Sequence, residues 1–234
     1  MKKLIIAALL GTFAITAPLI AAKPKAKAKA PISKALWDAK LTRTAEGNHL
    51  YGNPAAKVRL VEFISYTCPH CAHYAEDSKT PLLSGLVRQG KVAVEIRPFF
   101  RNLIDVPATL LAQCGPDAKF LGNHHAILAA QSQWLVSPSA EVQQKWAALE
   151  FASRIKTVAV DMGLYKLMLG RGYTPAQLDQ CLGNRALAEK LNKQTGDAVE
   201  KLGVQGTPSF LINGKLQDIY GWEQLSPRLD AALR

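Results

Sequence analysis

Two cysteines three positions apart, Cys68 and Cys71, are the residues of this chain best suited to covalent chemistry. Close thiols can cycle between a dithiol and a disulfide, because a thiolate attacks a disulfide sulfur through a mixed disulfide. Pro69 follows Cys68, and proline in the first helical position loses no helical hydrogen bond. The spacing therefore predicts that Cys68 lies at a helix N-terminus, where unpaired N–H groups and the helix dipole favour its thiolate.

The helix terminus alone does not make the Cys68 thiol acidic enough for this chemistry. Ionisation near pH 7 requires a fall in pKa from about 8.5 to about 6.5, which is on the order of 3 kcal/mol, whereas a helix end supplies about 0.3 to 2 kcal/mol. We expect the remainder from N–H hydrogen bonds and from the imidazole of His70. A stabilised thiolate favours the reduced form, so the pair should donate its disulfide, with Cys68 attacked and Cys71 resolving.

Three other uses of the cysteine pair fit the sequence less well. A zinc site needs a second close pair of ligands, and Cys114 and Cys181 stand alone. A c-type haem needs histidine directly after the second cysteine, where Ala72 stands. A purely structural disulfide remains open, although closing a four-residue loop removes only about 2 kcal/mol of chain entropy.

The segment before the pair has the composition of a buried strand. Residues 58–64 are rich in β-branched and aromatic side chains and are too few for a core helix. Glu62 shares strand parity with apolar neighbours, which places a carboxylate on an apolar face. Burial would raise its pKa and suit it to relay protons to and from Cys71. The alternatives are an ion pair with Lys91 or a solvated side chain at the sheet margin.

The remaining elements follow from periodicity and turn signals. A helix is expected to run from the cysteine pair toward Gln89, with a bend near Pro81, and to end at Gly90. Residues 103–202 are rich in Ala, Leu, Gln and Lys with repeated Gly and Pro breaks, which indicates a string of helices. Strands are expected at residues 40–44, 91–98, 208–212 and 216–220, and a closing helix at residues 223–233.

The helical segment carries other side chains that could have a function. Its aromatic residues could line a substrate groove, although such residues more often belong to a core: Trp134, Trp146, Phe151 and Tyr165. The neighbouring histidines His124 and His125 have no partner at ligand spacing and are given no role. His73, one helical turn after His70, is expected at the surface.

The N-terminus has the features of an export signal. Residues 1–22 place Lys2 and Lys3 before an apolar run that ends in small residues, which is typical of a secretory signal peptide. Residues 23–34 are rich in Lys, Ala and Pro without apolar periodicity, and are expected to form a disordered linker. Export leads to a compartment in which disulfides persist, here the periplasm.

The net charge gives little support to nucleic-acid binding. The chain carries 29 basic and 18 acidic residues, a formal charge of +11, but residues 1–30 hold six lysines and no acid. From Pro31 onward 23 basic residues stand against 18 acidic ones, so the remainder carries only +5. We expect no nucleic-acid partner and interpret the lysine-rich tail as a solvated spacer, with loose attraction to an anionic membrane or cell-wall polymer as the alternative.

Several separated features resemble the DsbA-like branch of the thioredoxin-fold oxidoreductases, over roughly residues 40–234. They are the Cys-Pro-His-Cys sequence at residues 68–71, Glu62 six residues before it, the Gly-Thr-Pro-Ser-Phe sequence at residues 206–210, and the long helical insertion. The resemblance implies an α/β thioredoxin fold, with a central mixed sheet flanked by helices and a large inserted helical domain. The implied domains are a thioredoxin-like domain at residues 35–102 and 203–234, and a helical domain at residues 103–202.

The resemblance also implies roles for individual residues. The peptide bond between Thr207 and Pro208 would be cis, and this loop would offer backbone groups to an extended substrate. Without the motif we would not propose such a bond, since about 5 to 6% of X-Pro bonds in folded proteins are cis. The implied catalytic residues are Cys68, Cys71, His70, Pro69 and Glu62.

The other two cysteines lie in the helical segment. If Cys68 pairs with Cys71, the remaining intramolecular bridge joins Cys114 to Cys181. A loop of that length would contribute about 4 kcal/mol on the chain-entropy estimate. We therefore predict a structural disulfide between them, with two buried free thiols as the alternative.

The favoured hypothesis is an exported thiol oxidase that donates the Cys68–Cys71 disulfide to folding secreted proteins through a mixed disulfide. Its substrates would be reduced secreted or periplasmic proteins. The resemblance suggests a quinone-linked membrane partner that reoxidises the pair, and implies no organic cofactor. We expect no metal ion and a monomeric protein.

Thr207 favours a second hypothesis, a disulfide isomerase or reductase that uses the same sulfurs. The best-known oxidases of the family carry Val before the cis-proline, whereas the related isomerases and reductases often carry Thr. Against an isomerase, residues 31–56 are too short for the N-terminal dimerisation domain that those isomerases use. A third hypothesis is a peptide-binding chaperone whose cysteine pair is only structural.

Overall fold

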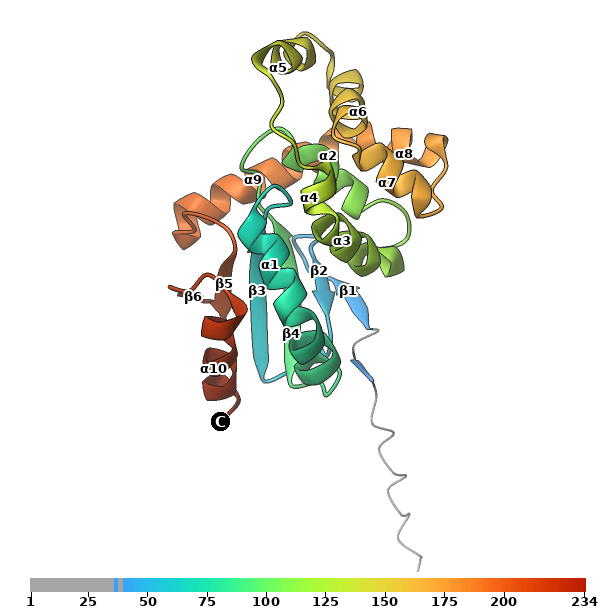
Figure 1. Ribbon diagram of the computed structural model, residues 1–234. Coiled ribbons are helices and arrows are strands. Elements are labelled where there is room, and N and C mark those ends of the chain that lie inside the picture. Colours follow the sequence, from blue (N-terminus) through green and yellow to red (C-terminus); the bar gives the residue numbers. More distant parts are fainter. Residues whose placement is uncertain (1–35, 38–39) are drawn as a thin grey trace, which may run out of the picture. The chain divides into compact units, whose positions relative to one another are not determined.

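The computed structural model describes residues 36–37 and 40–234 (Figure 1). The expected signal peptide (1–22) and linker (23–34) lie outside the described residues. Within the described part, six strands form one mixed sheet in the order β1-β2-β4-β3-β5-β6, in which β3 and β4 are parallel and the other neighbours antiparallel. The strands are β1 (Leu41–Arg43), β2 (His49–Tyr51), β3 (Val58–Ile64), β4 (Val92–Pro98), β5 (Ser209–Ile212) and β6 (Lys215–Gln217).

The central strand β3 is buried on both faces, which explains its nearly continuous apolar sequence. Leu60 and Ile64 belong to the main hydrophobic cluster, whereas Val61 and Phe63 belong to a smaller cluster on the opposite face. Because β3 and β4 run parallel, their carboxyl ends lie at the same edge of the sheet. The segment that carries the cysteine pair leaves β3 at this edge.

Helices cover both faces of the sheet and gather beyond that edge (Figure 1). Helices α1 and α10 cover one face, and α9 covers the other, where Ala198 packs against Val61 and Phe63. Helices α2 to α8 gather beyond the ends of β3 and β4. The helical elements are α1 (Pro69–Ser78), η2 (Lys79–Val87), α2 (Asp105–Ala112), η3 (Asp117–Lys119), α3 (Phe120–Ala129), α4 (Gln131–Trp134), α5 (Ala140–Ala147), α6 (Phe151–Asp161), α7 (Leu164–Gly170), α8 (Pro175–Leu182), α9 (Arg185–Leu202) and α10 (Trp222–Leu233).

One hydrophobic cluster runs from the sheet into the helices between β4 and β5. It joins Ile64 of the sheet to Leu111, Ile127 and Leu178 of α2, α3 and α8. Trp134 and Trp146 are buried in it, while Phe151 and Tyr165 are partly buried and pack against it. The aromatic residues of this segment therefore contribute to the core, the interpretation that the sequence favoured over a substrate groove.

The structure adds one strand to the expected elements and shifts the bounds of several others. Strand β2, residues 49–51, was not expected, because three residues are too few to show a periodicity. The second strand of the C-terminal hairpin ends at Gln217 rather than at residue 220. The bend near Pro81 takes the form of the π-helix η2, and the last helix begins at Trp222, one residue early.

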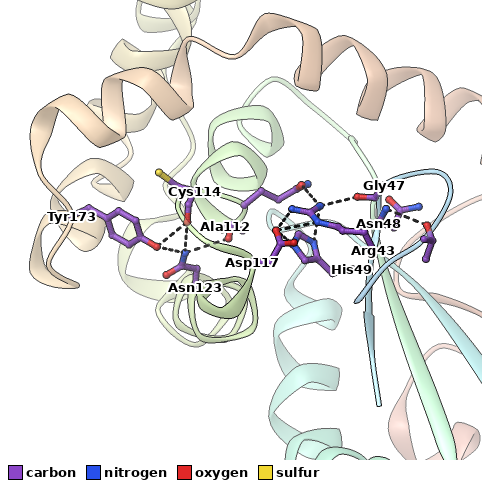
Figure 2. Close-up of polar contacts among 11 residues, drawn as sticks. Arg43, Gly47, Asn48, His49, Ala112, Cys114, Asp117, Asn123 and Tyr173 are labelled. Carbon is purple, nitrogen blue, oxygen red and sulfur yellow. Dashed lines mark hydrogen bonds and ion pairs between the residues drawn. The ribbon is translucent and has the colours of Figure 1, made fainter. Parts of the chain in front are cut away.

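Cys114 and Cys181, the pair for which the sequence predicted a bridge, form a disulfide that links the end of α2 to α8. The chain around Cys114 is also held by the buried amide of Asn123 on α3 (Figure 2). This amide donates to the carbonyls of Ala112 and Cys114, both at 3.3 Å, and to the hydroxyl of Tyr173 at 2.7 Å. Covalent and polar contacts therefore fix the same corner of the helical segment.

Replacing Cys114 and Cys181 with alanine should lower the free energy of unfolding by about 4 kcal/mol, because the bridge closes a loop with a sequence separation of 67. Urea unfolding of the native and double-alanine proteins at neutral pH measures this difference. A loss below about 1 kcal/mol would contradict a structural role for the bridge.

Candidate active site

Cys68 occupies the N-cap position of α1, with extended backbone angles (φ −93°, ψ 117°) and Pro69 as the first helical residue. Its carbonyl accepts hydrogen bonds from the backbone N–H groups of Cys71 at 3.1 Å and Ala72 at 3.3 Å. Cys68 and Cys71 are free thiols, and both are buried, Cys71 completely. The helix start expected at this pair is therefore present, and it directs N–H groups toward Cys68.

The environment lowers the pKa of the Cys68 thiol to about 5. The largest cause is a hydrogen bond from the Cys71 thiol, and burial acts in the opposite direction. The side chain of Thr207 and the backbone N–H groups of Cys71 and His70 lower the pKa further. The side chain of His70 is exposed, so this residue acts through its backbone N–H rather than through the imidazole that the sequence suggested.

The pKa of the Cys71 thiol is raised well above its usual value, the opposite of the shift at Cys68. Burial is the main cause, followed by the hydrogen bond and the charge of Cys68. A backbone hydrogen bond from Ser65 opposes the shift without cancelling it. The two sulfurs therefore differ strongly in acidity, and the proton of the pair stays on Cys71.

The loop before β5 completes the surroundings of Cys68. The peptide bond between Thr207 and Pro208 is cis, and the Cys68 thiol donates to the Thr207 carbonyl at 3.1 Å. Ser209 pairs with Phe63 in the antiparallel ladder of β3 and β5, which brings this loop to the end of β3. The Cys-Pro-His-Cys sequence and the Gly-Thr-Pro-Ser-Phe sequence, which are far apart along the chain, therefore lie in contact.

Glu62 is buried in β3 and accepts a hydrogen bond from the hydroxyl of Tyr74 on α1. Within the described residues Lys91 is not among its partners. Burial raises the pKa of Glu62 to about 7, and the bond from Tyr74 opposes this shift. Burial raises the pKa of Tyr74 well above its usual value, and the charge of Glu62 raises it further. Tyr74 lies three positions after Cys71 on α1, which places both residues on one face of the helix.

Three residues of the site were not singled out in the sequence. Tyr74 is the partner of Glu62, while Asp105 and Gln131 bind the loop that precedes Cys68. Residues 103–111 are apolar except for Asp105 and Thr109. A single acid in such a stretch is a signal from which the role of Asp105 could have been predicted. Gln131 lies in a polar stretch that carries no such signal.

The histidines near α1 and α3 lie in contrasting environments. His73 is exposed, and its Nδ1 lies 2.9 Å from Oδ2 of Asp77. His124 is buried, and its Nδ1 lies 2.9 Å from the hydroxyl of Tyr66. Burial lowers the pKa of His124 well below its usual value and that of His125 to about 4, so both are neutral near pH 7.

The described residues contain no group of three His, Cys, Asp or Glu side chains arranged to hold a metal ion. In the same part of the chain, no helix combines the length and the apolar character that crossing a membrane requires.

Comparison with known proteins supports a redox site. A thioredoxin family profile matches residues 44–231. A protein-disulfide oxidoreductase of Rickettsia typhi is 30% identical over 195 residues, covering 83% of this chain and 65% of that protein. The thiol:disulfide interchange protein DsbA of Haemophilus influenzae is 28% identical over 160 residues, covering 68% of this chain and 67% of that protein. The chain spans 62 to 67% of the length of the five relatives from Rickettsia.

A solved structure with the same architecture is also similar in sequence. The protein-disulfide isomerase from Novosphingobium aromaticivorans superposes with a TM-score of 0.78 at 42% identity, and the match covers 82% of this chain and 100% of that one.

The raised pKa of Glu62 predicts a stability that depends on pH. Between about pH 4.5 and pH 7 the folded protein holds a proton on Glu62 that the unfolded chain has lost, so stability falls as the pH rises through this window. Glu62→Gln removes the titration and keeps an acceptor for Tyr74. The variant should be more stable than the native protein by on the order of 3 kcal/mol at about pH 8, and by under about 1 kcal/mol at about pH 5.

Urea unfolding of the two reduced proteins at both pH values measures this difference. The titration of Cys68 contributes equally to the free energy of unfolding of both proteins, so it cancels from the difference. Glu76→Gln, at an exposed position of α1, is the control and should show no change. A Glu62→Gln difference that is the same at both pH values would refute a buried, protonated Glu62.

Proposed function

The chain belongs to the thioredoxin family, in its DsbA-like branch, and from this membership we propose that it is a thiol:disulfide oxidoreductase that donates its Cys68–Cys71 disulfide. The observation that carries the proposal is the opposite shift in pKa of the two sulfurs, down to about 5 at Cys68 and upward at Cys71. Only the reduced form of the pair contains the Cys68 thiolate, because in the oxidised form Cys68 is bonded to Cys71. Its stability favours reduction of the pair, and therefore oxidation of the client.

The reaction begins with the pair as a disulfide. A client thiolate attacks Cys68 Sγ, the bond between the two protein sulfurs breaks, and its electron pair leaves on Cys71 Sγ. A second client thiolate then attacks the client sulfur of this mixed disulfide, and Cys68 leaves as a thiolate. The client loses two electrons and the pair gains them. The low pKa of Cys68 makes it the better leaving group of the two protein sulfurs.

Glu62 has the properties of a proton donor to Cys71. The departing Cys71 sulfur has a raised pKa and must take up a proton, and Glu62 has a pKa of about 7 in a buried position. Tyr74 donates to Glu62 and lies on the same face of α1 as Cys71, so it would orient the carboxyl group for this transfer. The same group would accept the proton when the pair is reoxidised.

Isomerase or reductase activity is the second candidate, and two observations favour it. Thr207 lies beside Cys68 where the best-known oxidases carry Val. The relative from Novosphingobium, which is 42% identical, is described as a protein-disulfide isomerase. Both activities use the same sulfurs, so the redox potential of the pair decides between them.

The proposed setting is the periplasm. Residues 1–22 have the pattern of a cleavable signal peptide, and clients would be reduced secreted or periplasmic proteins. After each turnover the dithiol must return its two electrons to another oxidant, for which we propose a quinone-linked membrane protein. The proposed enzyme is a monomer without nucleic-acid partner.

Equilibration of the Cys68–Cys71 pair with glutathione tests the direction of the reaction. We expect a potential well above that of glutathione, because the Cys68 thiolate is stabilised, and a thiolate titration with its midpoint near pH 5. The Cys114→Ala, Cys181→Ala protein serves as the control for the other sulfurs. A potential at or below that of glutathione would favour the isomerase or reductase.

Cys71→Ser tests the order of the two sulfurs. In this variant the Cys68 thiolate attacks a disulfide of oxidised client, the client disulfide breaks, and one client sulfur leaves as a thiolate. The mixed disulfide on Cys68 should accumulate, because no Cys71 thiol resolves it, and reducing agent should release the client. Mass spectrometry of unreduced peptides locates the bond. Cys68→Ser should accumulate no such complex, and a complex on Cys71 instead would reverse the assignment.

A further inference from the structure

We propose that Asp105 and Gln131, two buried residues of the helical segment, form a loop clamp that holds residues 65–68 so that the first turn of α1 points its N–H groups at Cys68 Sγ. The clamp is a positioning device for the redox pair, and its importance for catalysis rests on the proposed function. Its two members come from α2 and α4 and contact different parts of the loop.

Asp105 holds the middle of the loop. Its side chain is completely buried, and Oδ1 accepts from the backbone N–H of Thr67 at 3.0 Å and from Ser65 Oγ at 2.8 Å. Oδ2 accepts from Thr67 Oγ1 at 3.1 Å and from the backbone N–H of Arg101 at 2.9 Å. The carboxylate therefore bridges the loop after β3 and the loop after β4.

An amide of the same shape cannot replace this carboxylate. Each oxygen of Asp105 accepts a backbone N–H, that of Thr67 on Oδ1 and that of Arg101 on Oδ2. Either orientation of an asparagine would place its NH₂ group against one of these donors. A buried donor that faces another donor loses its hydrogen bond and is not resolvated. The site is therefore specific for an acceptor on both sides.

Gln131 holds the end of the loop. Its buried side chain donates through Nε2 to the carbonyl of Tyr66 at 2.7 Å and to the carbonyl of Cys68 at 3.0 Å. The Cys68 carbonyl is also the acceptor for the N–H groups of Cys71 and Ala72. Gln131 therefore fixes the carbonyl on which the first turn of α1 is built.

Residues 65–68, the clamped loop, set the positions of both sulfurs. The N–H of Cys68 donates to the Ser65 carbonyl at 3.3 Å, so the position of Ser65 sets the direction in which α1 begins. The N–H groups of His70 and Cys71 that stabilise the Cys68 thiolate belong to this first turn, and a backbone hydrogen bond from Ser65 reaches Cys71. Asn102 adds a hydrogen bond from Nδ2 to Thr67 Oγ1 at 2.9 Å.

Two ways in which Asp105 could act on Cys68 predict effects of opposite sign. If Asp105 acted only as a nearby negative charge, its removal would lower the pKa of the Cys68 thiol. If it positions the loop, its removal lets the N–H groups move away from the sulfur, and the pKa rises. The direction of the change therefore separates the two roles.

The test compares Asp105→Asn and Gln131→Met with the native protein. We expect each to raise the pKa of Cys68, by about one unit in Asp105→Asn, and to lower the equilibrium constant for oxidation of glutathione about tenfold. The ultraviolet absorbance of the thiolate gives the pKa, and equilibration with glutathione gives the constant. Gln131→Met conserves size and charge, so it tests the clamp even if Asp105→Asn does not fold.

Asn123→Ala is the matched control. It removes a buried amide that binds carbonyls of the same helical segment (Figure 2). The hydrogen bonds of Asn123 within the described residues go to Ala112, Cys114, Tyr173 and Arg171, not to residues 65–68. It should lower stability in urea and leave the Cys68 pKa unchanged. The clamp would be refuted if Gln131→Met and Asp105→Asn lost stability with the native pKa of Cys68, or if Asp105→Asn lowered that pKa.

The two readouts separate this proposal from the proposed function. The thiolate titration needs neither client nor glutathione, so it judges the clamp even if the native pair proves to be weakly oxidising. If the native pair proves weakly oxidising, disulfide donation is refuted. If the Cys68 pKa nevertheless rises in both variants, the clamp stands.

Discussion

The structure depends on how one sulfur atom is stabilised where β3 ends and α1 begins. A thiolate in a buried position loses solvation, so it forms only if hydrogen-bond donors replace the water. At Cys68 these donors are the Cys71 thiol and two backbone N–H groups at the start of α1, and the side chain of Thr207 also lowers the pKa. Four segments that are separate in the sequence must therefore meet: β3, α1, the loop before β5, and the helices that hold the turn between β3 and α1.

Buried carboxylates show how the surroundings assign a role to the same chemical group. Glu95 is buried between the guanidinium groups of Arg59 and Arg97, which balance its charge. Asp105 accepts two backbone N–H groups and two hydroxyls, so it serves as a fixed acceptor. Among the described residues, the hydrogen-bond partner of Glu62 is the neutral hydroxyl of Tyr74, and burial raises its pKa to about 7. Glu62 is therefore suited to exchange protons near neutral pH.

Local chemistry and strand parity could be predicted from the sequence, and long-range polar contacts could not. The cysteine spacing and Pro69 predicted the helix start at Cys68, and the period of two placed Glu62 on an apolar face. The clamp joins Thr67 to Asp105 and Cys68 to Gln131, pairs that are 38 and 63 positions apart. No local pattern reports such a contact, since the partner of a buried polar group is fixed only once the chain has folded. Strand β2 was missed for a different reason, its three-residue length.

The topology explains why the helical segment contributes to the redox site. Parallel strands β3 and β4 end at one edge of the sheet, so the segment that leaves β4 must pass beside the segment that leaves β3. In this chain the segment after β4 leads into α2, and Asp105 is the first residue of this helix. The helices between β4 and β5 are thus placed to bind the loop before Cys68, and their buried residues are continuous with the core under the sheet. In the proposed clamp, Asp105 and Gln131 connect the packing of this segment to the position of the sulfur.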